Sequence, residues 1–182
     1  MAAPDAPDLE PVEIHPYDPT WPSQYEALAE RACSALGGVA LGIHHIGSTS
    51  VPGLAAKPLV DVIVLVASFE PIRAYAEPLS AMGFIYRADD EPRHRFFKND
   101  PRTAQIHVVD PTSDWVRVHV LFRDYLRVHP DAARAYEDLK GALAVRFRNN
   151  RKAYTDAKGP FIDATIQDAE AWAERTGWVV RT

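Results

Sequence analysis

The stretch from residue 44 to residue 66, HHIGSTSVPGLAAKPLVDVIVLV, constrains what this chain can fold into more than any other segment. A short strand-like segment ends at Gly47, and three small hydroxyl residues follow it. After an irregular segment that contains Gly and Pro, Asp61 opens an unbroken apolar run. Such a run is typical of a strand that is buried on both faces of a sheet. The sequence therefore predicts two central strands, over residues 41–46 and 59–66, whose connection carries polar side chains at the edge of the sheet.

The length and composition describe one globular domain. The chain has 182 residues, of which 47% are hydrophobic and 25% charged, and this is enough for one domain with a substantial core. Three prolines and three acidic residues within residues 1–11 predict a flexible tail, so residues 12–182 are expected to form the single domain. The chain shows no apolar run long enough to cross a membrane and no signal-peptide pattern. We therefore expect a cytoplasmic protein with no membrane partner.

The net charge of -5 conceals a basic segment. Residues 117–158 contain ten Lys or Arg residues and five Asp or Glu residues, a local charge of +5. This segment is either a surface that faces an anionic small molecule or a solvated helical face whose charges are partly neutralised. The acidic total and the lack of interleaved basic and aromatic residues argue against a nucleic-acid partner.

The remaining pattern predicts helices around a mixed sheet. Hydrophobic periodicity, caps and breakers place helices over residues 23–36, 68 or 70–82, 114–128, 130–147 and 151–176, the last with an interruption at Gly159-Pro160. Short strands are expected over residues 84–86, 95–98 and 104–109. The single cysteine, Cys33, excludes an intramolecular disulfide and a cysteine-based zinc site, and its place in the first helix predicts a small buried side chain. The order of elements predicts an α+β fold with a mixed β-sheet flanked by helices and a helical C-terminal half.

The connection after Gly47 has the composition of a phosphate-binding turn. Glycine lets the backbone approach a ligand closely. Ser48, Thr49 and Ser50 supply hydroxyl donors, and a turning chain supplies free N–H groups. Lys57 comes ten residues after Gly47, so the segment is not a P-loop, in which Lys directly follows a glycine. Serines also fill turns and cap helices when no ligand is present, and this alternative stays open.

Asp61 is expected at the edge of the sheet, where ligands bind in many α/β proteins. A buried carboxylate without a partner is strongly unfavourable. We therefore expect a partner, which is Lys57, a metal ion or the N–H groups of the Gly47 turn. In the alternative interpretation, Asp61 only pins the loop.

This region resembles the DNA polymerase beta-like nucleotidyltransferases. Their pattern is a hydrophobic residue, Gly and Gly or Ser, a spacer, and then Asp, a hydrophobic residue and Asp or Glu. Here the residues Ile46-Gly47-Ser48 are followed by twelve residues and then by Asp61-Val62-Ile63. The spacing fits the pattern, but Ile63 stands where the second carboxylate is expected. Two-metal phosphoryl transfer uses paired carboxylates, whereas one carboxylate can hold one Mg²⁺ together with water and substrate phosphate.

A longer resemblance lies within that superfamily. The stretch HIGSTSVPGLAAKPLVDVIV is similar to the signature of the GrpB family, and so are the later segments FFK at residues 96–98, QIHVV at residues 105–109 and FRDYLR at residues 122–127. The resemblance extends roughly over residues 12–175. Members of that family occur alone, fused to acetyltransferases, or as an extra domain after dephospho-CoA kinase. The resemblance implies a nucleotidyltransferase-like fold.

His107 is the residue that could complete the site from a neighbouring strand. The strand over residues 104–109 is expected beside Asp61, and an imidazole there can bind a metal ion or act as a base near neutral pH. His107 would then replace the missing carboxylate as the second metal ligand or as the base. A histidine on a strand can also be purely structural.

Two pairs of helical residues have the spacing of a shared helix face. Arg123 and Arg127 could reach a phosphate, or Arg123 could instead pair with Asp124. Tyr154 and Lys158 suit a ring that stacks on a nucleobase beside an amine that binds a phosphate. They could equally form an ordinary helical face.

Together these features predict a small-molecule nucleotidyltransferase, or a related phosphate-handling enzyme, as the leading hypothesis. The turn Gly47–Ser50 and Lys57 would hold the phosphates of a nucleotide, and Asp61 would hold one divalent metal ion, expected to be Mg²⁺. The catalytic residues would be Asp61, Lys57 and His107. The alternative is a non-catalytic module that binds a nucleotide or CoA, because Ile63 removes the second carboxylate. The sequence does not specify the acceptor, the nucleobase or the oligomeric state.

Overall fold

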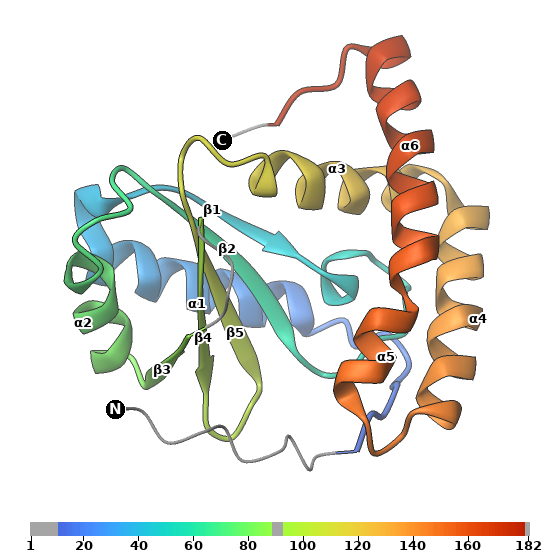
Figure 1. The fold of residues 1–182 in the computed structure, drawn as a ribbon, viewed down its shortest axis with the longest axis horizontal. Coiled ribbons are helices and arrows are strands. Elements are labelled where there is room, and N and C mark those ends of the chain that lie inside the picture. Colours follow the sequence, from blue (N-terminus) through green and yellow to red (C-terminus); the bar gives the residue numbers. More distant parts are fainter. Residues whose placement is uncertain (1–10, 89–92, 181–182) are drawn as a thin grey trace.

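The two strands predicted from the central motif lie side by side in a computed structural model of the chain, which describes residues 11–88 and 93–180 (Figure 1). Strand β1 covers Ala40–Ile46 and pairs antiparallel with β2, which covers Val60–Val66. A short 3-10 turn, η2, follows β1 at Ser48–Ser50. The polar connection therefore begins where β1 leaves the sheet.

Three further strands complete a five-stranded sheet. They are β3 (Phe84–Arg87), β4 (His94–Asn99) and β5 (Ala104–Val109), and the order across the sheet is β1-β2-β5-β4-β3. Strand β5 runs parallel to β2, and the other neighbouring pairs are antiparallel. The predicted mixed sheet is therefore confirmed. The register places Gln105 opposite Asp61 and His107 opposite Ile63.

Helices α1 (Trp21–Leu36) and α2 (Arg73–Ala81) cover one face of the sheet. The strands contribute several β-branched side chains to this face, among them Val62, Val64, Ile106 and Val108. These belong to the same core cluster as Leu28, Ala32, Tyr75 and Leu79 of the two helices. Full burial of one such side chain contributes roughly 1.5–3 kcal/mol. This layer therefore fixes the positions of β2 and β5, the two strands that carry polar residues to the opposite face.

The C-terminal half is helical, as the sequence predicts. It consists of α3 (Trp115–Val128), α4 (Pro130–Arg146), α5 (Arg151–Ala157) and α6 (Gly159–Thr176). Helix α3 packs on the second face of the sheet through Val116 and Val120, and α6 packs against α3 through Ala169 and Ala173. The predicted interruption at Gly159-Pro160 separates α5 from α6. In Figure 1 the helices α4, α5 and α6 lie together on one side of the sheet.

The position of β1 differs from the prediction. Strand β1 lies at the edge of the sheet rather than in its centre. Leu41, one of its residues, is 56% exposed. Pairing partners are set by the tertiary fold, so the strand's own sequence does not reveal that only one neighbour is present. Near the N-terminus, His15 forms an isolated β-bridge with Ala56.

The first helix also differs in two details. Helix α1 begins at Trp21 rather than after Ser23, because Pro22 has the backbone angle of a first helical turn. Cys33 is exposed rather than buried. It follows Ala32, which lies on the buried stripe of the helix, and the next residue along a helix points about 100° away.

Part of the N-terminal region and part of one loop lie outside the described residues. The flexible tail predicted over residues 1–11 lies outside the described residues except for Pro11. The acidic part of the loop between β3 and β4, residues 89–92, also lies outside them. None of the helices within residues 11–88 and 93–180 has the length and apolar character that crossing a membrane requires.

Candidate functional site

Gly47 lies directly against Asp61. Ile46 pairs with Asp61 in the β1–β2 register, so the chain turns at Gly47 beside the carboxylate. Gly47 has φ of 69° and ψ of -176°, a conformation that residues with a side chain rarely adopt. A β-carbon at residue 47 would collide with Oδ2 of Asp61 and lie 3.0 Å from its Cγ. Both the backbone conformation and the close approach therefore require glycine.

The carboxylate of Asp61 is held from the neighbouring strand. Its Oδ1 accepts a hydrogen bond from Nε2 of Gln105, and Oε1 of Gln105 accepts one from Nη2 of Arg102 at 2.6 Å. Burial raises the pKa of Asp61, while the charge of Lys57 and the hydrogen bond from Gln105 oppose the rise. The ionised carboxylate therefore depends on the cations around it.

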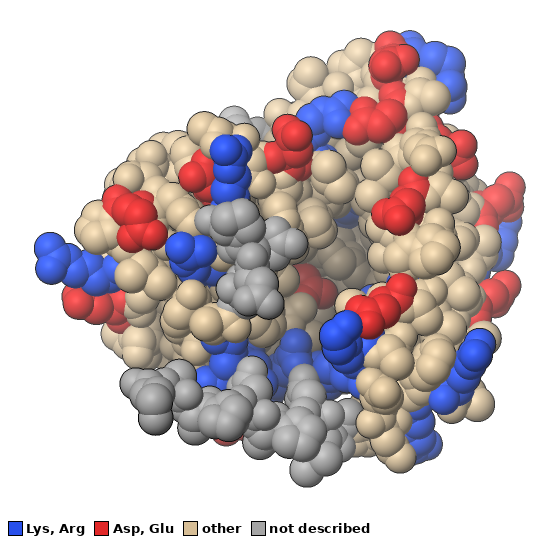
Figure 2. Space-filling view, viewed as in Figure 1, with Lys and Arg blue, Asp and Glu red and all other residues tan. Residues whose placement is uncertain are grey.

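A cavity of about 260 Å³ opens in front of Gly47 and Asp61, between the sheet and the helical half. Among the described residues that line it are five basic side chains and one carboxylate, Asp61; the basic ones are Lys57, Arg102, Lys140, Arg151 and Lys158. Figure 2 shows this face hollowed between the two halves of the molecule, with Lys and Arg side chains gathered along the lower edge of the hollow. The pocket thus carries an excess of positive charge.

Burial lowers the pKa of the three pocket lysines. The pKa of Lys57 falls to about 8, because of burial and then of the charges of Lys158 and Arg151, while Asp61 opposes the fall. The pKa of Lys140 falls to about 7 through burial and the neighbouring ammonium groups. Burial also lowers the pKa of Lys158, again opposed by Asp61. These cations repel one another in a poorly hydrated space, and a bound anion would relieve that repulsion.

Tyr154 contacts two of these lysines. The ring centroid lies 5.4 Å from Nζ of Lys57 and 4.8 Å from Nζ of Lys158, within the range of cation–π interactions. The residue is buried, and burial raises the pKa of its phenol to about 12. The structure thus places the pair Tyr154 and Lys158 in the pocket, with the ring against amines. Stacking of this ring on a nucleobase stays a prediction.

Lys140 is a pocket residue that the sequence analysis did not single out. Its Nζ donates to Oγ of Ser48 at 3.0 Å and to the carbonyl of Ala55, and the carboxylate of Glu137 accepts a hydrogen bond from the Ala55 N–H at 2.8 Å. Helix α4 therefore holds the connection between β1 and β2. The signal was present in the helical periodicity, because Lys140 lies one turn after Tyr136 on the buried stripe of α4.

Arg102 and Arg151 are two further pocket residues outside the predicted set. Arg102 lies in the connection just before β5, and Arg151 is the first residue of α5, after its cap. Arg151, Lys140 and Lys158 all belong to the basic segment 117–158, which was predicted to face either an anion or solvent. Its charge alone could not identify which three of ten basic residues converge, since that depends on how the helices are oriented.

The three hydroxyl groups of the turn have different roles. The hydroxyl of Ser48 contacts a lysine of the pocket. Oγ1 of Thr49 lies 3.0 Å from Nε2 of His45, and Oγ of Ser50 donates to the carbonyl of Gly47. Thr49 and Ser50 therefore use their hydroxyls to hold the turn, and the hydroxyl presented to the pocket is that of Ser48.

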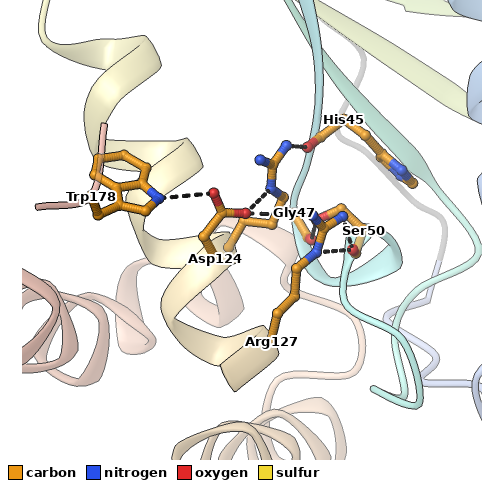
Figure 3. Close-up of polar contacts among 7 residues, drawn as sticks. His45, Gly47, Ser50, Asp124, Arg127 and Trp178 are labelled. Atoms are coloured by element: carbon orange, nitrogen blue, oxygen red, sulfur yellow. Dashed lines mark hydrogen bonds and ion pairs between the residues drawn. The ribbon is translucent and has the colours of Figure 1, made fainter. Parts of the chain in front are cut away.

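Arg123 and Arg127 contact the backbone at His45 and Ser50, and Figure 3 shows Arg127 directed at Ser50. Nη1 of Arg123 donates to the carbonyl of His45 at 2.9 Å, and Nε and Nη2 of Arg127 donate to the carbonyl of Ser50 at 3.0 and 2.7 Å. Both arginines line a second cavity, on the other side of the turn, rather than the pocket in front of Asp61. Instead of reaching a phosphate in that pocket, they position the backbone around the turn.

Asp124 connects these arginines to the C-terminal segment. It accepts hydrogen bonds from Nε of Arg123 at 2.7 Å and from Nε1 of Trp178 at 3.1 Å (Figure 3). The pairing of Arg123 with Asp124, one of the two alternatives that the sequence left open, is therefore the one seen in the structure.

His107 lies in an aromatic cluster rather than in the pocket. Its Nδ1 is 2.8 Å from Nε2 of His94, and its ring stacks on Trp115 with centroids 5.4 Å apart. Burial lowers the pKa of His107 well below its usual value. The parallel pairing of β2 and β5 places Gln105, not His107, opposite Asp61. The structure therefore does not bring the predicted second ligand or base to the pocket.

The residues around Asp61 do not fit a resident two-metal site. Such a site needs paired carboxylates, and Ile63 stands in the second position. Within the part of the chain that the structure describes, no group of three or more His, Cys, Asp or Glu side chains could hold a metal ion. Gln105, which is hydrogen-bonded to Asp61, has both its amide nitrogen and its amide oxygen engaged. The surrounding basic side chains favour an anion over a bare cation.

Known proteins show the same sequence pattern. The family model described as GrpB protein matches residues 11–168. The chain is 40% identical to the UPF0157 protein PA4798 of Pseudomonas aeruginosa, over 83% of this chain and 64% of that one. It is 38% identical to the UPF0157 protein SCO7215 of Streptomyces coelicolor, over 91% and 88%, and 30% identical to a dephospho-CoA kinase of Mycobacterium tuberculosis, over 92% and 48%. The chain thus spans less than two thirds of some of these relatives.

Solved structures agree with the sequence matches. The structure of the conserved protein GrpB from Enterococcus faecalis superimposes with a TM-score of 0.81 at 31% identity, over 88% of this chain and 99% of that one. A weaker likeness, to the Cid1 poly(U) polymerase, has a TM-score of 0.47 at 15% identity over 70% of this chain, and it is no basis for assigning an activity. Because the family model matches residues 11–168 and the Streptomyces coelicolor relative is 38% identical over most of both chains, the chain belongs to the GrpB family.

Proposed function

We propose that the pocket in front of Gly47 and Asp61 binds the phosphate groups of a small molecule, with a nucleotide or a CoA derivative as the favoured class. The observation that carries the proposal is the convergence of five basic side chains on a pocket with one carboxylate. These cations come from the β1–β2 connection, from the segment before β5, from helices α4 and α5, and from the junction between α5 and α6. Such convergence from distant segments is unusual for charges that serve only solubility, because it maximises their mutual repulsion.

Electrostatics support an anionic ligand. Lys57 and Lys140 have lowered pKa values because their ammonium groups are poorly hydrated and lie near other cations. A phosphate that enters the pocket supplies the missing negative charge and stabilises the protonated lysines. Arginine adds a planar fork that can bind phosphate oxygens in pairs. The cavity of about 260 Å³ suits the phosphates and an adjoining sugar better than a complete extended ligand.

Transfer of a nucleotidyl group is the second candidate function. It is favoured by the position of Asp61 beside the Gly47 turn, the arrangement that the nucleotidyltransferase resemblance associates with metal-assisted transfer. Asp61 would be the protein carboxylate on a Mg²⁺ ion that arrives with the ligand phosphates. The non-catalytic alternative is favoured by Ile63, which leaves that ion without a second carboxylate. A nucleotide ligand fits the cytoplasmic location expected from the sequence.

A panel of phosphorylated compounds tests the proposal. It consists of nucleoside mono-, di- and triphosphates, pyrophosphate and CoA derivatives, each with and without Mg²⁺. CoA derivatives are included because the chain is similar to about half of a dephospho-CoA kinase. A ligand present at 100 times its dissociation constant stabilises the folded protein by about 2.7 kcal/mol, which thermal unfolding detects. Failure of every phosphorylated compound to stabilise the protein would contradict the proposal.

A matched pair of lysine substitutions tests the location of the site. Lys158→Gln removes a cation from the pocket, whereas Lys152→Gln removes one whose side chain is 86% exposed and pairs with Asp156. We expect Lys158→Gln to weaken ligand binding by about tenfold or more, or about 1.4 kcal/mol. Lys152→Gln should leave it within about twofold, because exposed ion pairs contribute little. Equal losses in the two variants would place the ligand elsewhere.

A further inference from the structure

Ser48 and Lys140 form a contacting pair on the wall of the pocket. Nζ of Lys140 lies 3.0 Å from Oγ of Ser48, and the same nitrogen donates to the carbonyl of Ala55. Lys140 is only 2% exposed, whereas Ser48 is partly exposed and lines the cavity. A ligand in the pocket can therefore reach the hydroxyl, and the amine that contacts it is almost fully buried.

The surroundings of Lys140 allow both the ammonium form and the neutral amine near neutral pH. Burial lowers its pKa to about 7, and the charges of Lys158 and Lys57 add to the effect. A neutral amine has one lone pair. With one N–H donated to the carbonyl of Ala55, that lone pair can accept the proton of the Ser48 hydroxyl across the same 3.0 Å contact.

Two other titratable groups of helix α4 face this pair. Burial raises the pKa of Tyr136, against the effect of its hydrogen bond with Ser48, so the phenol stays protonated at neutral pH. The carboxylate of Glu137 accepts a hydrogen bond from the N–H of Ala55 at 2.8 Å and opposes the fall in the pKa of Lys140. Glu137 thus holds the backbone of Ala55, to which Lys140 donates, and Tyr136 contacts the Ser48 hydroxyl.

We infer that Ser48 is a nucleophile with Lys140 as its general base, and that this pair accepts a phosphoryl or nucleotidyl group from a phosphoanhydride bound in the pocket. The inference rests on the proposed function, because the anhydride must first bind to the basic side chains. A hydroxyl paired with an adjacent base is the arrangement that makes a serine reactive at neutral pH. It requires no second carboxylate, which fits the presence of Ile63 on β2.

The step balances without an additional reactant. Oγ of Ser48 attacks a phosphorus atom of the anhydride, and its proton moves to Nζ of Lys140. A P–O bond forms to Oγ, while the bond between phosphorus and the bridging oxygen breaks and its electron pair leaves on that oxygen. The products are a phosphoester of Ser48, the ammonium form of Lys140 and a released phosphate-containing anion. The positive charges of Lys57 and Lys158 stabilise the charge that develops on the leaving group.

Labelling of the full chain tests the inference. The protein is incubated with each of the four ribonucleoside triphosphates, labelled on the α or the γ phosphorus, with and without Mg²⁺, and quenched in acid. A phosphoester of serine survives acid, whereas a phosphoramidate of lysine or histidine does not. We expect acid-stable label on the peptide that contains Ser48, identified by mass spectrometry. The labelled position that is retained shows which P–O bond breaks.

Three variants separate the roles of the two residues. Ser48→Ala should abolish the label, and Ser80→Ala, an exposed serine on α2, should leave it unchanged. Lys140→Arg keeps a positive charge and hydrogen-bond donors but gives no base, because arginine stays protonated. It should slow labelling by roughly 10²–10⁴-fold, the usual contribution of a general base. In the wild type the labelling rate should rise with pH through about 7, and this rise should be absent in Lys140→Arg.

Calorimetric binding measurements on the same samples, with the whole ligand panel, distinguish failure of this inference from failure of the proposed function. Binding of a triphosphate without acid-stable label overturns this inference and leaves the proposed function standing. Absence of binding by every phosphorylated compound overturns both. Label that persists in Ser48→Ala, or that forms equally fast in Lys140→Arg, also overturns the inference, since another residue would then be the acceptor or the base.

Discussion

The backbone of Gly47 lies so close to the carboxylate of Asp61 that no side chain fits between them. The two residues come from different strands, and the β1–β2 register brings them together. The contact fixes the start of the polar turn relative to the one acidic group of the pocket. Changes at either residue are therefore expected to alter both the shape and the charge of the site.

Replacing Gly47 by alanine should destabilise the protein more than the same change at Gly53. Both glycines have positive φ, of 69° and 81°, and alanine in such a conformation costs roughly 1–2 kcal/mol. At Gly47 the new methyl group would also collide with Asp61, whereas at Gly53 no atom lies within 4 Å. Overpacking of this kind adds roughly 1–3 kcal/mol. Urea unfolding measures the difference, and equal losses in the two variants would mean that the loop relaxes without strain.

The affinity of the pocket for sulfate should fall as pH rises from 7 to 9. Sulfate keeps its charge over this range, so the change must come from the protein. The pKa of Lys57 is lowered to about 8, so its charge is mostly present at pH 7 and mostly lost at pH 9. Lys140, at about 7, adds to the fall at the lower end. The loss of sulfate affinity between pH 7 and pH 9 that is due to Lys57 is at most about tenfold, or about 1.4 kcal/mol.

Two variants assign this pH dependence. Lys57→Met should weaken sulfate binding at pH 7 and flatten the profile between pH 8 and 9. Arg151→Met should weaken binding at every pH without flattening the profile, because arginine does not titrate there. Its loss should shift the fall in affinity to higher pH, since the charge of Arg151 lowers the pKa of Lys57. Calorimetric titrations at several pH values provide the measurement. A profile that is equally steep in Lys57→Met would assign the titration to another group.

Asp61→Asn should have opposite effects on anion binding with and without magnesium. Asparagine keeps the shape of the side chain but removes the negative charge of the one carboxylate among the described residues that line the pocket. In the absence of metal, pyrophosphate should therefore bind more tightly than to the wild type. With Mg²⁺ present, any additional affinity that the metal confers on the wild type should be lost, because a hard cation requires a charged oxygen ligand. If Asp61 only pins the loop, the variant should instead lose stability, and binding should follow the folded fraction in both conditions.

Arg127→Lys should loosen the turn without removing a charge. The two hydrogen bonds from Arg127 to the carbonyl of Ser50 (Figure 3) need the planar guanidinium. We expect a loss of about 1–2 kcal/mol in stability and faster hydrogen exchange at the amides of residues 50 and 51. Arg134→Lys, at an exposed position on α4, is the matched control and should change neither quantity. Unchanged exchange in Arg127→Lys would show that the turn is held by its internal hydrogen bonds alone.

Several elements of the fold could be predicted from local sequence patterns. The apolar run after Asp61, the polar turn after Gly47 and the break at Gly159-Pro160 are local patterns, and the structure confirms the strands and helices that they predict. Local patterns suffice here because a strand buried on both faces, a glycine-rich turn and a proline-containing break each depend on nearby residues. Lys57 and Asp61 are close together in the chain, so the sequence could also predict that they lie near one another.

The sequence by itself thus determined the elements, the family resemblance and the turn beside Asp61. The tertiary structure decided which residues complete the pocket. The parallel register of β2 and β5 places Gln105 opposite Asp61 and His107 two pairs further along the strands, in the aromatic cluster. The rotation of α4 about its axis decides that Lys140 faces the pocket. Register and helix rotation are set by packing between segments far apart in the chain, and no local pattern encodes them.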